Sequence, residues 1–253
     1  RVHPRSRFGE IETLAASFNR MLDRIQQLMS ELREVTDNIA HDLRSPITRI
    51  RGAAELALTR RPGPDDCQTV MAGTICECDH LLAMVDTMLL IAEIESGRRT
   101  RGTDRVDLDH LLGEACDLFE PVATEKGVHL EFHRSGEALP VAGDGGALQR
   151  MVANLLDNAL KYTPSGGHVW VHAALRGADL EVRIQDTGVG IPPGDLPHIF
   201  ERFFRGDPAR QERGSGLGLS LAQAVVRAHG GGIDIQSAPG QGTQVRVLLP
   251  RAV

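Results

Sequence analysis

One histidine, His41, has neighbours that suggest chemistry as well as packing. It lies in the run IAHDLRSP (39–46), inside a stretch whose apolar residues recur with helical spacing. Neutral imidazole is abundant at pH 7 and is a good nucleophile, and the adjacent carboxylate of Asp42 would stabilise the cation formed when the ring attacks. Because most histidines on helices are structural, this interpretation requires a second set of reactive residues elsewhere in the chain.

Three polar residues far downstream, Asn154, Asn158 and Lys161, fit such a set. They lie at positions i, i+4 and i+7 of a helix expected near 147–162, on a stripe separate from its apolar residues. An asparagine carbonyl oxygen is a hard ligand that suits Mg²⁺, and an ammonium group suits a polyphosphate. The same pattern also fits a solvated helix face, so the spacing alone leaves both interpretations open.

Asp186 ends an expected strand and begins a glycine-rich run. Its carboxylate could accept a hydrogen bond from a donor such as the adenine amino group. Gly188 and Gly190 would let the backbone approach a ligand closely. A plain strand-ending turn would use the same residue types, so this run too has two interpretations.

A second glycine-rich run, GSGLGL (214–219), opens a helix expected over 217–229. Gly216, Leu217 and Gly218 would present backbone N–H groups and the positive end of the helix dipole to a phosphate group. No strand directly precedes the run and no Gly-Lys-Ser/Thr follows it, which excludes a dinucleotide fingerprint and a P-loop.

The segment between these two runs combines aromatic and charged residues. Three of the seven phenylalanines fall within FERFFR (200–205), which ends at Arg205, and residues 206–213 are polar and charged. A mobile lid anchored by aromatic side chains fits this composition, and so does a loop pinned to the core.

The first hundred residues must form the helices that position His41. Their apolar side chains recur in alternating steps of three and four, the heptad pattern of helices packed against partner helices. The two heptad series are Ile11, Leu14, Phe18, Met21, Ile25, Leu28, Leu32, Val35 and Ile39, then Met71, Ile75, Cys78, Leu82, Val85, Leu89 and Ala92. The step from Ile39 to Leu43 is four where three is due, a stutter beside His41, and Pro46 predicts a bend.

Two heptad helices joined by a short break around Pro62–Pro64 predict an antiparallel helical hairpin. A hairpin buries only one stripe of each helix, whereas two hairpins make a four-helix bundle. We therefore expect a homodimer, followed by a linker over residues 98–104.

From about Val106 onward the pattern becomes that of a mixed α/β domain. Apolar residues alternate with polar ones in four stretches, which predicts strands with one buried face: 169–173, 180–184, 233–235 and 245–249. Three amphipathic stretches predict helices that cover this face: 109–125, 147–162 and 217–229. The predicted fold class is therefore multidomain, a helical hairpin followed by a two-layer α/β sandwich.

The composition excludes several classes of protein. A net charge of −6 argues against non-specific nucleic-acid binding, and no run of 18 apolar residues is present to span a membrane. The four cysteines lack paired metal-ligand spacing, which favours reduced thiols. Because the sequence begins at Arg1 inside a coiled-coil pattern, we expect a fragment of a longer protein.

Taken in order, these runs resemble the sensor histidine kinases of bacterial two-component systems. The run around His41 matches the H box, and 154–162, 186–190, 200–205 and 214–218 match the N, G1, F and G2 boxes. The resemblance covers nearly the whole chain. It implies four regions: the C-terminal part of a HAMP-like signalling helix (1–29), a dimerisation and phosphoacceptor hairpin (30–97), a linker (98–104) and a catalytic ATP-binding domain of Bergerat, or GHKL, type (105–253).

The resemblance also implies roles for individual residues. His41 would accept the γ-phosphoryl group of ATP with Asp42 as its base, and Asn158 would bind Mg²⁺. The group would then pass to an aspartate of a response regulator. Relatives that also dephosphorylate their regulator usually carry Thr or Asn where this chain has Ser45, which leaves phosphatase activity open. The implied ATP-binding set is Asn154, Asn158, Lys161, Tyr162, Asp186, Gly188, Gly190, Arg205, Gly216, Leu217 and Gly218.

Finally, the resemblance implies a location and leaves alternatives. The full-length protein would lie at the cytoplasmic face of the bacterial inner membrane, with this soluble portion reaching the membrane only through a missing upstream segment and binding no nucleic acid. The main alternative is a nucleotide-binding regulatory, scaffold or phosphatase-only dimer without kinase turnover. A GHKL ATPase of the chaperone or gyrase kind is a second alternative, although it would not need a histidine on a heptad hairpin.

Overall fold

The computed structural model describes residues 7–60, 64–97, 104–206 and 215–252, and in parts of the first helix, including 30–39 and 41–42, it describes the backbone alone. The chain divides into two compact units that meet between Asp79 and His80. Across the described ranges, no helix combines the length and apolar character needed to cross a bilayer.

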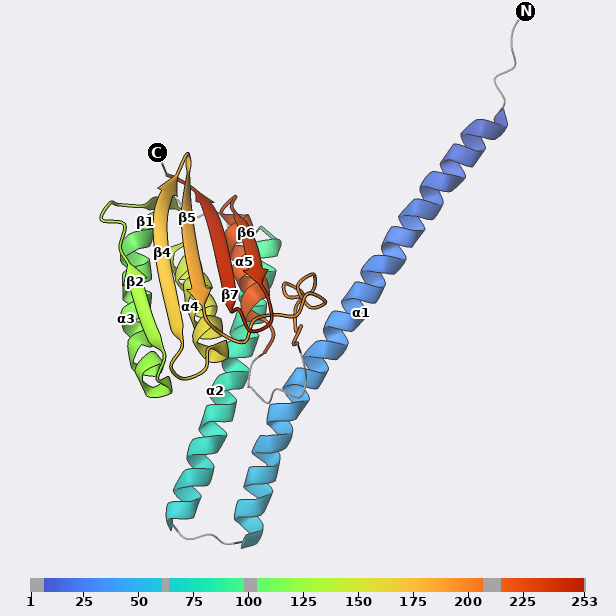
Figure 1. Cartoon of the computed structure of the whole chain (residues 1–253). Helices are drawn as coiled ribbons and strands as arrows, with labels where there is room; N and C mark the ends of the chain where they lie inside the picture. The colour runs from blue at the N-terminus through green and yellow to red at the C-terminus, as the bar shows by residue number, and fades with distance from the viewer. Residues whose placement is uncertain (1–6, 61–63, 98–103, 207–214, 253) are drawn as a thin grey trace, which may run out of the picture. The chain divides into compact units, whose positions relative to one another are not determined.

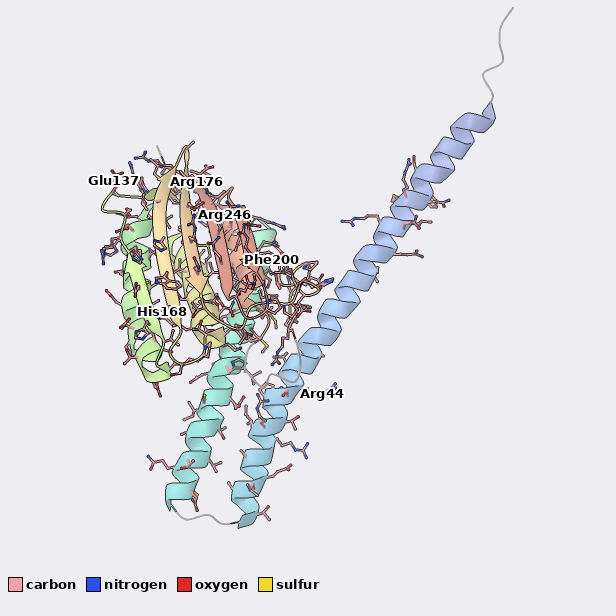
Figure 2. All side chains as sticks on the ribbon, viewed as in Figure 1. Arg44, Glu137, His168, Arg176, Phe200 and Arg246 are labelled. Carbon is pink, nitrogen blue, oxygen red and sulfur yellow. The ribbon has the colours of Figure 1, made fainter. Side chains whose placement is uncertain are left out.

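The first unit is built from α1 (Arg7–Arg60) and the opening turns of α2 (Pro64–Glu95). Pro46 lies inside α1, where its ring and its missing N–H disturb the hydrogen bonding of the preceding turn. The helix nevertheless runs on to Arg60, and Figures 1 and 2 show it changing direction near Arg44. The proline therefore does not end the helix.

The heptad stripe of α1 and α2 is open to solvent in the single chain. Its members with described and exposed side chains are Phe18, Met21, Ile25, Met71, Ile75, Cys78, Leu82, Val85, Leu89 and Ala92. Ile75, the second residue of the second series, is 61% exposed. Soluble proteins rarely leave a long row of large apolar side chains in water, so this stripe has the character of an interface.

The second unit contains a five-stranded sheet in the order β2-β4-β5-β7-β6 and a separate ladder of β1 with β3. The strands are β1 (Arg105–Asp107), β2 (His129–His133), β3 (Pro140–Ala142), β4 (His168–Arg176), β5 (Asp179–Asp186), β6 (Gly232–Ser237) and β7 (Thr243–Pro250). Strand β2 pairs with β4 in parallel, and the other ladders are antiparallel.

Three helices cover one face of this sheet and lie behind it in the view of Figure 1: α3 (Leu108–Lys126), α4 (Gly145–Tyr162) and α5 (Gly218–Ala228). Asp107 and Asp144 cap the first turns of α3 and α4, because each carboxylate accepts a hydrogen bond from a backbone N–H of its helix. Gly127 ends α3 with a φ of 70°, a left-handed conformation that glycine adopts without strain.

The core lies between the three helices and the inward side of the strands. On β4, Val169 and Val171 are fully buried, whereas the alternate residues His168 and Trp170 lie on the opposite, open face. Leu148, Met151 and other apolar residues of α4 fill the space facing the strands. One face of the sheet is thus packed and the other meets water.

The sequence-based description of this domain is confirmed in outline. The three predicted helices occur within two residues of their expected bounds, and the four predicted strands lie inside β4, β5, β6 and β7. The short strands β1, β2 and β3 were not predicted, because three to five residues are too few for alternation to stand out.

Candidate functional site

A cavity of about 330 Å³ opens between α4, the end of β5 and the beginning of α5. Its volume lies within the range of small-molecule sites. Most of the predicted nucleotide-binding residues line it: Asn154, Asn158, Lys161, Tyr162, Asp186, Gly190, Arg205, Gly216 and Gly218. Residues from four separate sequence runs therefore meet at one hollow.

Helix α4 presents its amides to this cavity because its opposite stripe is anchored in the core. Leu148, Val152 and Leu156 are fully buried. The amide nitrogen of Asn154 donates to the carbonyl of Arg150 over 2.8 Å. Its carbonyl oxygen lies 2.9 Å from the point where a Cβ of Gly218 would stand, so it faces the opening turn of α5.

The C-terminal end of α4 is held by a side chain from another helix. The ammonium of Lys126 donates to the carbonyl of Leu160 over 2.8 Å and also to that of Lys161. These carbonyls have no partner within their own helix, and a cation there also complements the helix dipole. Beyond them, the Lys161 ammonium lies 5.0 Å from the ring centre of Tyr162, which is 41% exposed at the cavity.

Asp186 is the buried acid of the cavity, with 7% of its surface exposed. Its Oδ1 accepts hydrogen bonds from the backbone N–H of Gly188 over 2.7 Å and of Thr243 over 3.1 Å. Burial raises the pKa of this carboxyl above its ordinary value, and the two N–H groups act in the opposite direction. Since both bonds use Oδ1, the second oxygen can accept from a ligand.

The loop after Asp186 depends on glycine at one position in particular. Gly190 has a φ of 69°, and any Cβ on it would collide with the carbonyl of Ala238. The backbone of this loop therefore packs directly on the turn between β6 and β7. This contact forms one wall of the cavity, to which Val189, Ile191 and Pro192 also contribute.

The first turn of α5 forms the opposite wall, and its N-cap residue Leu217 makes no side-chain cap hydrogen bond. Among the described residues the opening N–H groups thus lack the usual side-chain acceptor, and the positive end of the helix dipole faces the cavity beside Gly216 and Gly218. Gly216 has a φ of 67°, and its carbonyl accepts from the N–H of Phe203 over 3.0 Å. Phe203 itself has a φ of 64°, a strained conformation for a bulky residue.

Two predicted site residues do not line the cavity. Gly188 donates its N–H to Asp186 instead, and Leu217 is buried at 1% exposure beneath the first turn of α5. Conversely, Thr243, Asp157 and Ser215 line the cavity without having been predicted. Thr243 had a sequence signal, since GQGT (240–243) separates two alternating stretches in the way of a tight turn.

Asp157 adds a negative charge that sequence analysis did not consider. It lies between the two asparagines of α4 and lines the cavity. Desolvation by the surrounding protein raises the pKa of its carboxyl, and the ammonium groups of Lys161 and Lys126 partly offset that effect. The carboxyl of Asp157 and the ammonium of Lys161 are therefore close enough to interact electrostatically.

The predicted phosphoacceptor lies in the other unit. His41 and Asp42 belong to the helical backbone of α1, but their side chains lie outside the described residues, as do positions 207–214 of the expected lid. Ser45 is exposed, and its hydroxyl accepts from Arg49 over 2.7 Å. Arg49 also makes a two-pronged ion pair with Glu77 of α2, at 3.0 and 2.8 Å.

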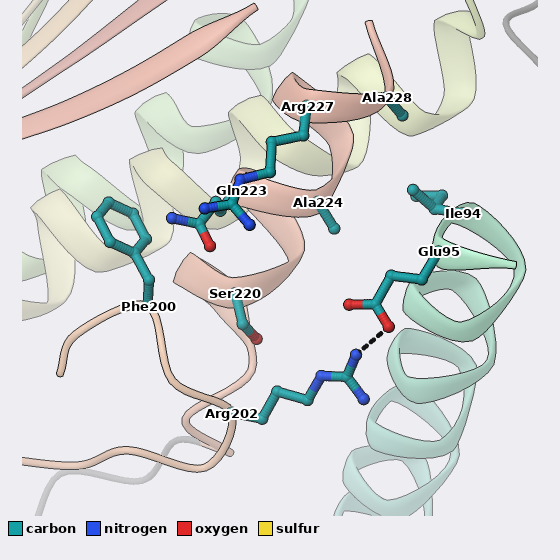
Figure 3. A pocket seen from close by; sticks show the side chains of 9 residues that line it. All are labelled: Ile94, Glu95, Phe200, Arg202, Ser220, Gln223, Ala224, Arg227 and Ala228. Atoms are coloured by element: carbon teal, nitrogen blue, oxygen red, sulfur yellow. Dashed lines mark hydrogen bonds and ion pairs between the residues drawn. The ribbon is translucent and has the colours of Figure 1, made fainter. Parts of the chain in front are cut away.

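A second recess of about 300 Å³ lies within the second unit, between the end of α2 and α5 (Figure 3). The Arg202 guanidinium forms an ion pair with Glu95 across its mouth. Ser220, Gln223 and Arg227 of α5 line its far side. None of the predicted site residues borders this recess, and a solvent-exposed ion pair of this kind contributes less than about 1 kcal/mol.

Two family profiles match the chain. Residues 31–97 match the His Kinase A (phospho-acceptor) domain, and residues 143–253 match the histidine kinase-, DNA gyrase B- and HSP90-like ATPase. The second match encloses the whole cavity described above. Because the matched family is one of ATPases, the match indicates that this domain uses ATP.

Known proteins give the same assignment. The sensor histidine kinase CusS of Escherichia coli K12 is 33% identical over 252 residues, which are 99% of this chain and 52% of that protein. The mycobacterial sensor histidine kinase MprB is 34% identical and has a TM-score of 0.50, over 59% of this chain and 97% of that structure. The chain spans about half the length of the curated relatives it matches.

A further solved structure shares the fold over most of the chain. It contains the histidine kinase ThkA in complex with the response regulator protein TrrA. It has a TM-score of 0.69 and 23% identity, and the match covers 93% of this chain and 66% of that one. At this identity the likeness establishes the arrangement of helices and sheet alone.

Proposed function

Because this chain belongs to the sensor histidine kinases, we propose that it uses ATP to phosphorylate His41 and passes the phosphoryl group to an aspartate of a response regulator. One observation carries the proposal: a single cavity joins Asn154 and Asn158, the carboxylate of Asp186 and the uncapped N-terminus of α5. The two asparagines would bind a metal ion, the carboxylate would bind the adenine base, and the helix N-terminus would bind the phosphates.

The nucleotide would lie with its adenine at Asp186 and its phosphates at α5. The available oxygen of Asp186 accepts from the exocyclic amino group, which a guanine ring does not present at that position. The N–H groups of the first turn of α5 bind phosphate oxygens, and Lys161 and Arg205 add positive charge. Tyr162 packs beside the nucleotide at the cavity wall.

We propose Mg²⁺ as the accompanying ion, with Asn158 as its protein ligand. Among the described residues no three His, Cys, Asp or Glu side chains converge on a metal position, so the ion would depend on amide and phosphate oxygens. Mg²⁺ suits such a site because it retains waters and binds through phosphates. When bound, it neutralises charge that develops on the transferred phosphoryl group.

The transfer itself needs positioning more than covalent help from the protein. One ring nitrogen of His41 attacks the γ-phosphorus, the bond from phosphorus to the bridging oxygen breaks, and ADP leaves. Asp42 stabilises the cationic ring that forms and takes up its proton. The phosphohistidine then gives its phosphoryl group to the regulator's aspartate, whose carboxylate oxygen forms the new bond.

We further propose the four regions expected from sequence and a homodimer. The exposed stripe that includes Ile75 and Leu82 supports pairing of two hairpins into a four-helix bundle. In the full-length protein the HAMP-like helix would connect this portion to the cytoplasmic face of the membrane. Phosphatase activity remains a subsidiary proposal, since the Ser45 hydroxyl can bind a water but is engaged here by Arg49.

The deciding experiment is incubation of the chain with γ-labelled ATP and Mg²⁺. Wild type should acquire label that is stable in alkali and labile in acid, as expected for phosphohistidine, and His41→Gln should acquire none. His41→Gln should bind ATP as well as wild type, because α1 is not part of the cavity.

Two other outcomes would overturn the proposal. Equal labelling of His41→Gln would place the acceptor elsewhere. If wild type binds ATP but acquires no label, and an artificially dimerised form of the chain also acquires none, the regulatory, scaffold or phosphatase-only alternative is favoured.

A further inference from the structure

The open face of the sheet carries four of the ten histidines of the chain. His129 and His133 lie on β2, and His168 and His172 lie on the neighbouring strand β4. The inward residues of the same strands, such as Val169 and Val171, are buried, so the histidines all point to the solvent side. Figure 2 shows this face toward the viewer, with His168 labelled.

The parallel register of β2 and β4 places the histidines in two opposed pairs. His129 is opposite His168, and His133 is opposite His172. The rings of the second pair are stacked with centroids 4.4 Å apart and planes inclined by 7°. Those of the first pair are 4.8 Å apart at 25°. Each pair thus brings two imidazoles from different strands to one point.

One ring nitrogen of the four histidines stands out as unsatisfied. Among the described residues, the buried Nδ1 of His168 has no hydrogen-bond partner, which is uncommon for a buried polar atom. Neutral imidazole is the form that binds metal ions.

The neighbouring charges do not prevent a cation from binding here. Arg183, opposite His172 on β5, is paired with Glu181 at 2.6 Å, and Arg176 pairs with the same glutamate at 2.6 Å. Glu131 lies on β2 between the two histidine pairs, opposite Trp170. The positive charges of Arg183 and Arg176 near the histidine pairs are therefore offset by the carboxylates of Glu181 and Glu131.

We propose that this face binds transition-metal ions that prefer imidazole, such as Cu²⁺, Ni²⁺ or Zn²⁺, with one ion held by each cross-strand histidine pair. Two nitrogens bound to one ion at 2.0–2.1 Å stand roughly 3–4 Å apart with their lone pairs converging, so metal binding must turn both rings of a pair out of the parallel stack. The two pairs are four residues apart along the strands, or about 13 Å, so they cannot share an ion. Water completes each coordination sphere.

A bound ion would link the edge strand β2 to β4. In the part of the chain that the structure describes, strand β2 pairs with β4 alone and forms one edge of the sheet. The expected result is a domain that becomes more resistant to unfolding in the presence of the metal, because an ion that binds only the folded pairs stabilises the folded state.

The sole tryptophan of the chain makes this proposal directly measurable. Trp170 stacks on His168, with ring centres 5.3 Å apart, and lies between the two pairs. The untagged chain, with Cys67, Cys76 and Cys78 changed to serine in every sample to remove thiolate ligands, is titrated with Cu²⁺ or Ni²⁺. Tryptophan fluorescence and calorimetric stoichiometry are followed, and diamagnetic Zn²⁺ is used as a competitor.

The expected result is quenching at one ion per pair, reversed by Zn²⁺. His133→Ala with His172→Ala should remove one ion, and all four replacements should remove both. His172→Ala alone should weaken its site by about tenfold or more, because two linked ligands bind far more tightly than one. His110→Ala, an exposed histidine on α3, is the matched control and should change nothing.

An unchanged stoichiometry in the pair variants would overturn the proposal. So would an equal, small loss of affinity for every single replacement, including His110→Ala, because that pattern describes independent surface imidazoles. Neither the fluorescence nor the calorimetric stoichiometry depends on ATP or on phosphorylation, so this test is independent of the test of kinase activity.

Discussion

Asp186 shows how one residue can be fixed by its surroundings and still be available for a ligand. Two backbone N–H groups hold Oδ1, and the carboxyl is buried. Burial without a full set of partners raises its pKa, so the ionised form is present only above a pH that is higher than usual for aspartate. A hydrogen-bond donor of the nucleotide would stabilise this buried carboxylate, so the unfavourable burial in the free protein would be offset on binding.

Nucleotide affinity should therefore depend on pH through Asp186. As pH falls through the raised pKa, the carboxylate is protonated and its acceptor capacity declines, so adenosine binding should weaken as the solution is made acid. Asp186→Asn keeps the shape and an oxygen for the two N–H groups. It should bind about tenfold or more weakly at pH 7, because a hydrogen bond to a charged group is lost, and its profile should be flatter.

Calorimetric titration with adenosine, which has no phosphate to titrate, measures this profile from pH 7 down through the acid range in which the carboxyl is protonated. Asp195→Asn, another acid at the cavity wall, is the matched control and should leave affinity unchanged. A wild-type profile that coincides with that of Asp186→Asn would contradict the assignment of this residue.

Among the elements, α5 depends most on the absence of a side chain at its start. Gly218 stands at its first position, and a Cβ there would lie 2.9 Å from Oδ1 of Asn154 and 3.5 Å from Nδ2 of Asn158. A Cβ at this residue would therefore displace the side-chain amide of Asn154, which faces the start of α5. The space beside this residue lies where the phosphates are proposed to bind.

Gly218→Ala should lower ATP affinity by about tenfold or more without unfolding the domain. Alanine is a better helix former than glycine by about 1 kcal/mol, so the helix itself gains, whereas the added methyl group displaces Asn154. Nucleotide binding and thermal unfolding measured on the same variant separate the two effects. Gly194→Ala meets no atom within 4 Å and should change neither quantity.

Periodicity predicted the elements well and the contacts between them poorly. The helices and the four longer strands follow from apolar spacing alone, because one face of each must be buried. The bond from Thr243 to Asp186 joins residues 57 positions apart and depends on the register of β5 against β7. The turn at 240–243 is visible in the sequence, but no local pattern encodes the register that brings Thr243 to Asp186, so this contact was not predicted.

The same limit applies to the two glycine-rich runs. Gly188 and Leu217 were assigned to the nucleotide site from the runs that contain them, yet neither lines the cavity. A glycine-rich run indicates that the backbone approaches something closely, and which glycine meets ligand and which meets protein depends on the packed neighbours.

On the scale of the whole molecule, the exposed heptad stripe predicts that two chains associate. Ile75→Glu places a charge on that stripe, where burial of an unpaired carboxylate costs several kcal/mol. The variant should shift the chain from dimer to monomer in sedimentation experiments at micromolar concentration.

Leu118→Glu provides the matched control for that experiment. Leu118 is 69% exposed on α3, away from the heptad stripe, and its replacement should leave the association state unchanged. A dimer that persists in Ile75→Glu, or a monomeric wild type, would contradict the proposed four-helix bundle.

The start of α5, which lacks a side-chain cap at Leu217, limits how far the free energy of unfolding of this domain can be raised. Elsewhere a serine or aspartate at the N-cap would add about 1 kcal/mol, and Asp107 and Asp144 provide such caps for α3 and α4. At Leu217 the same change would occupy the N–H groups that are proposed to bind phosphate, and it would also remove a leucine side chain that is only 1% exposed. A stabilising cap at this helix end would therefore cost both core packing and the proposed phosphate site.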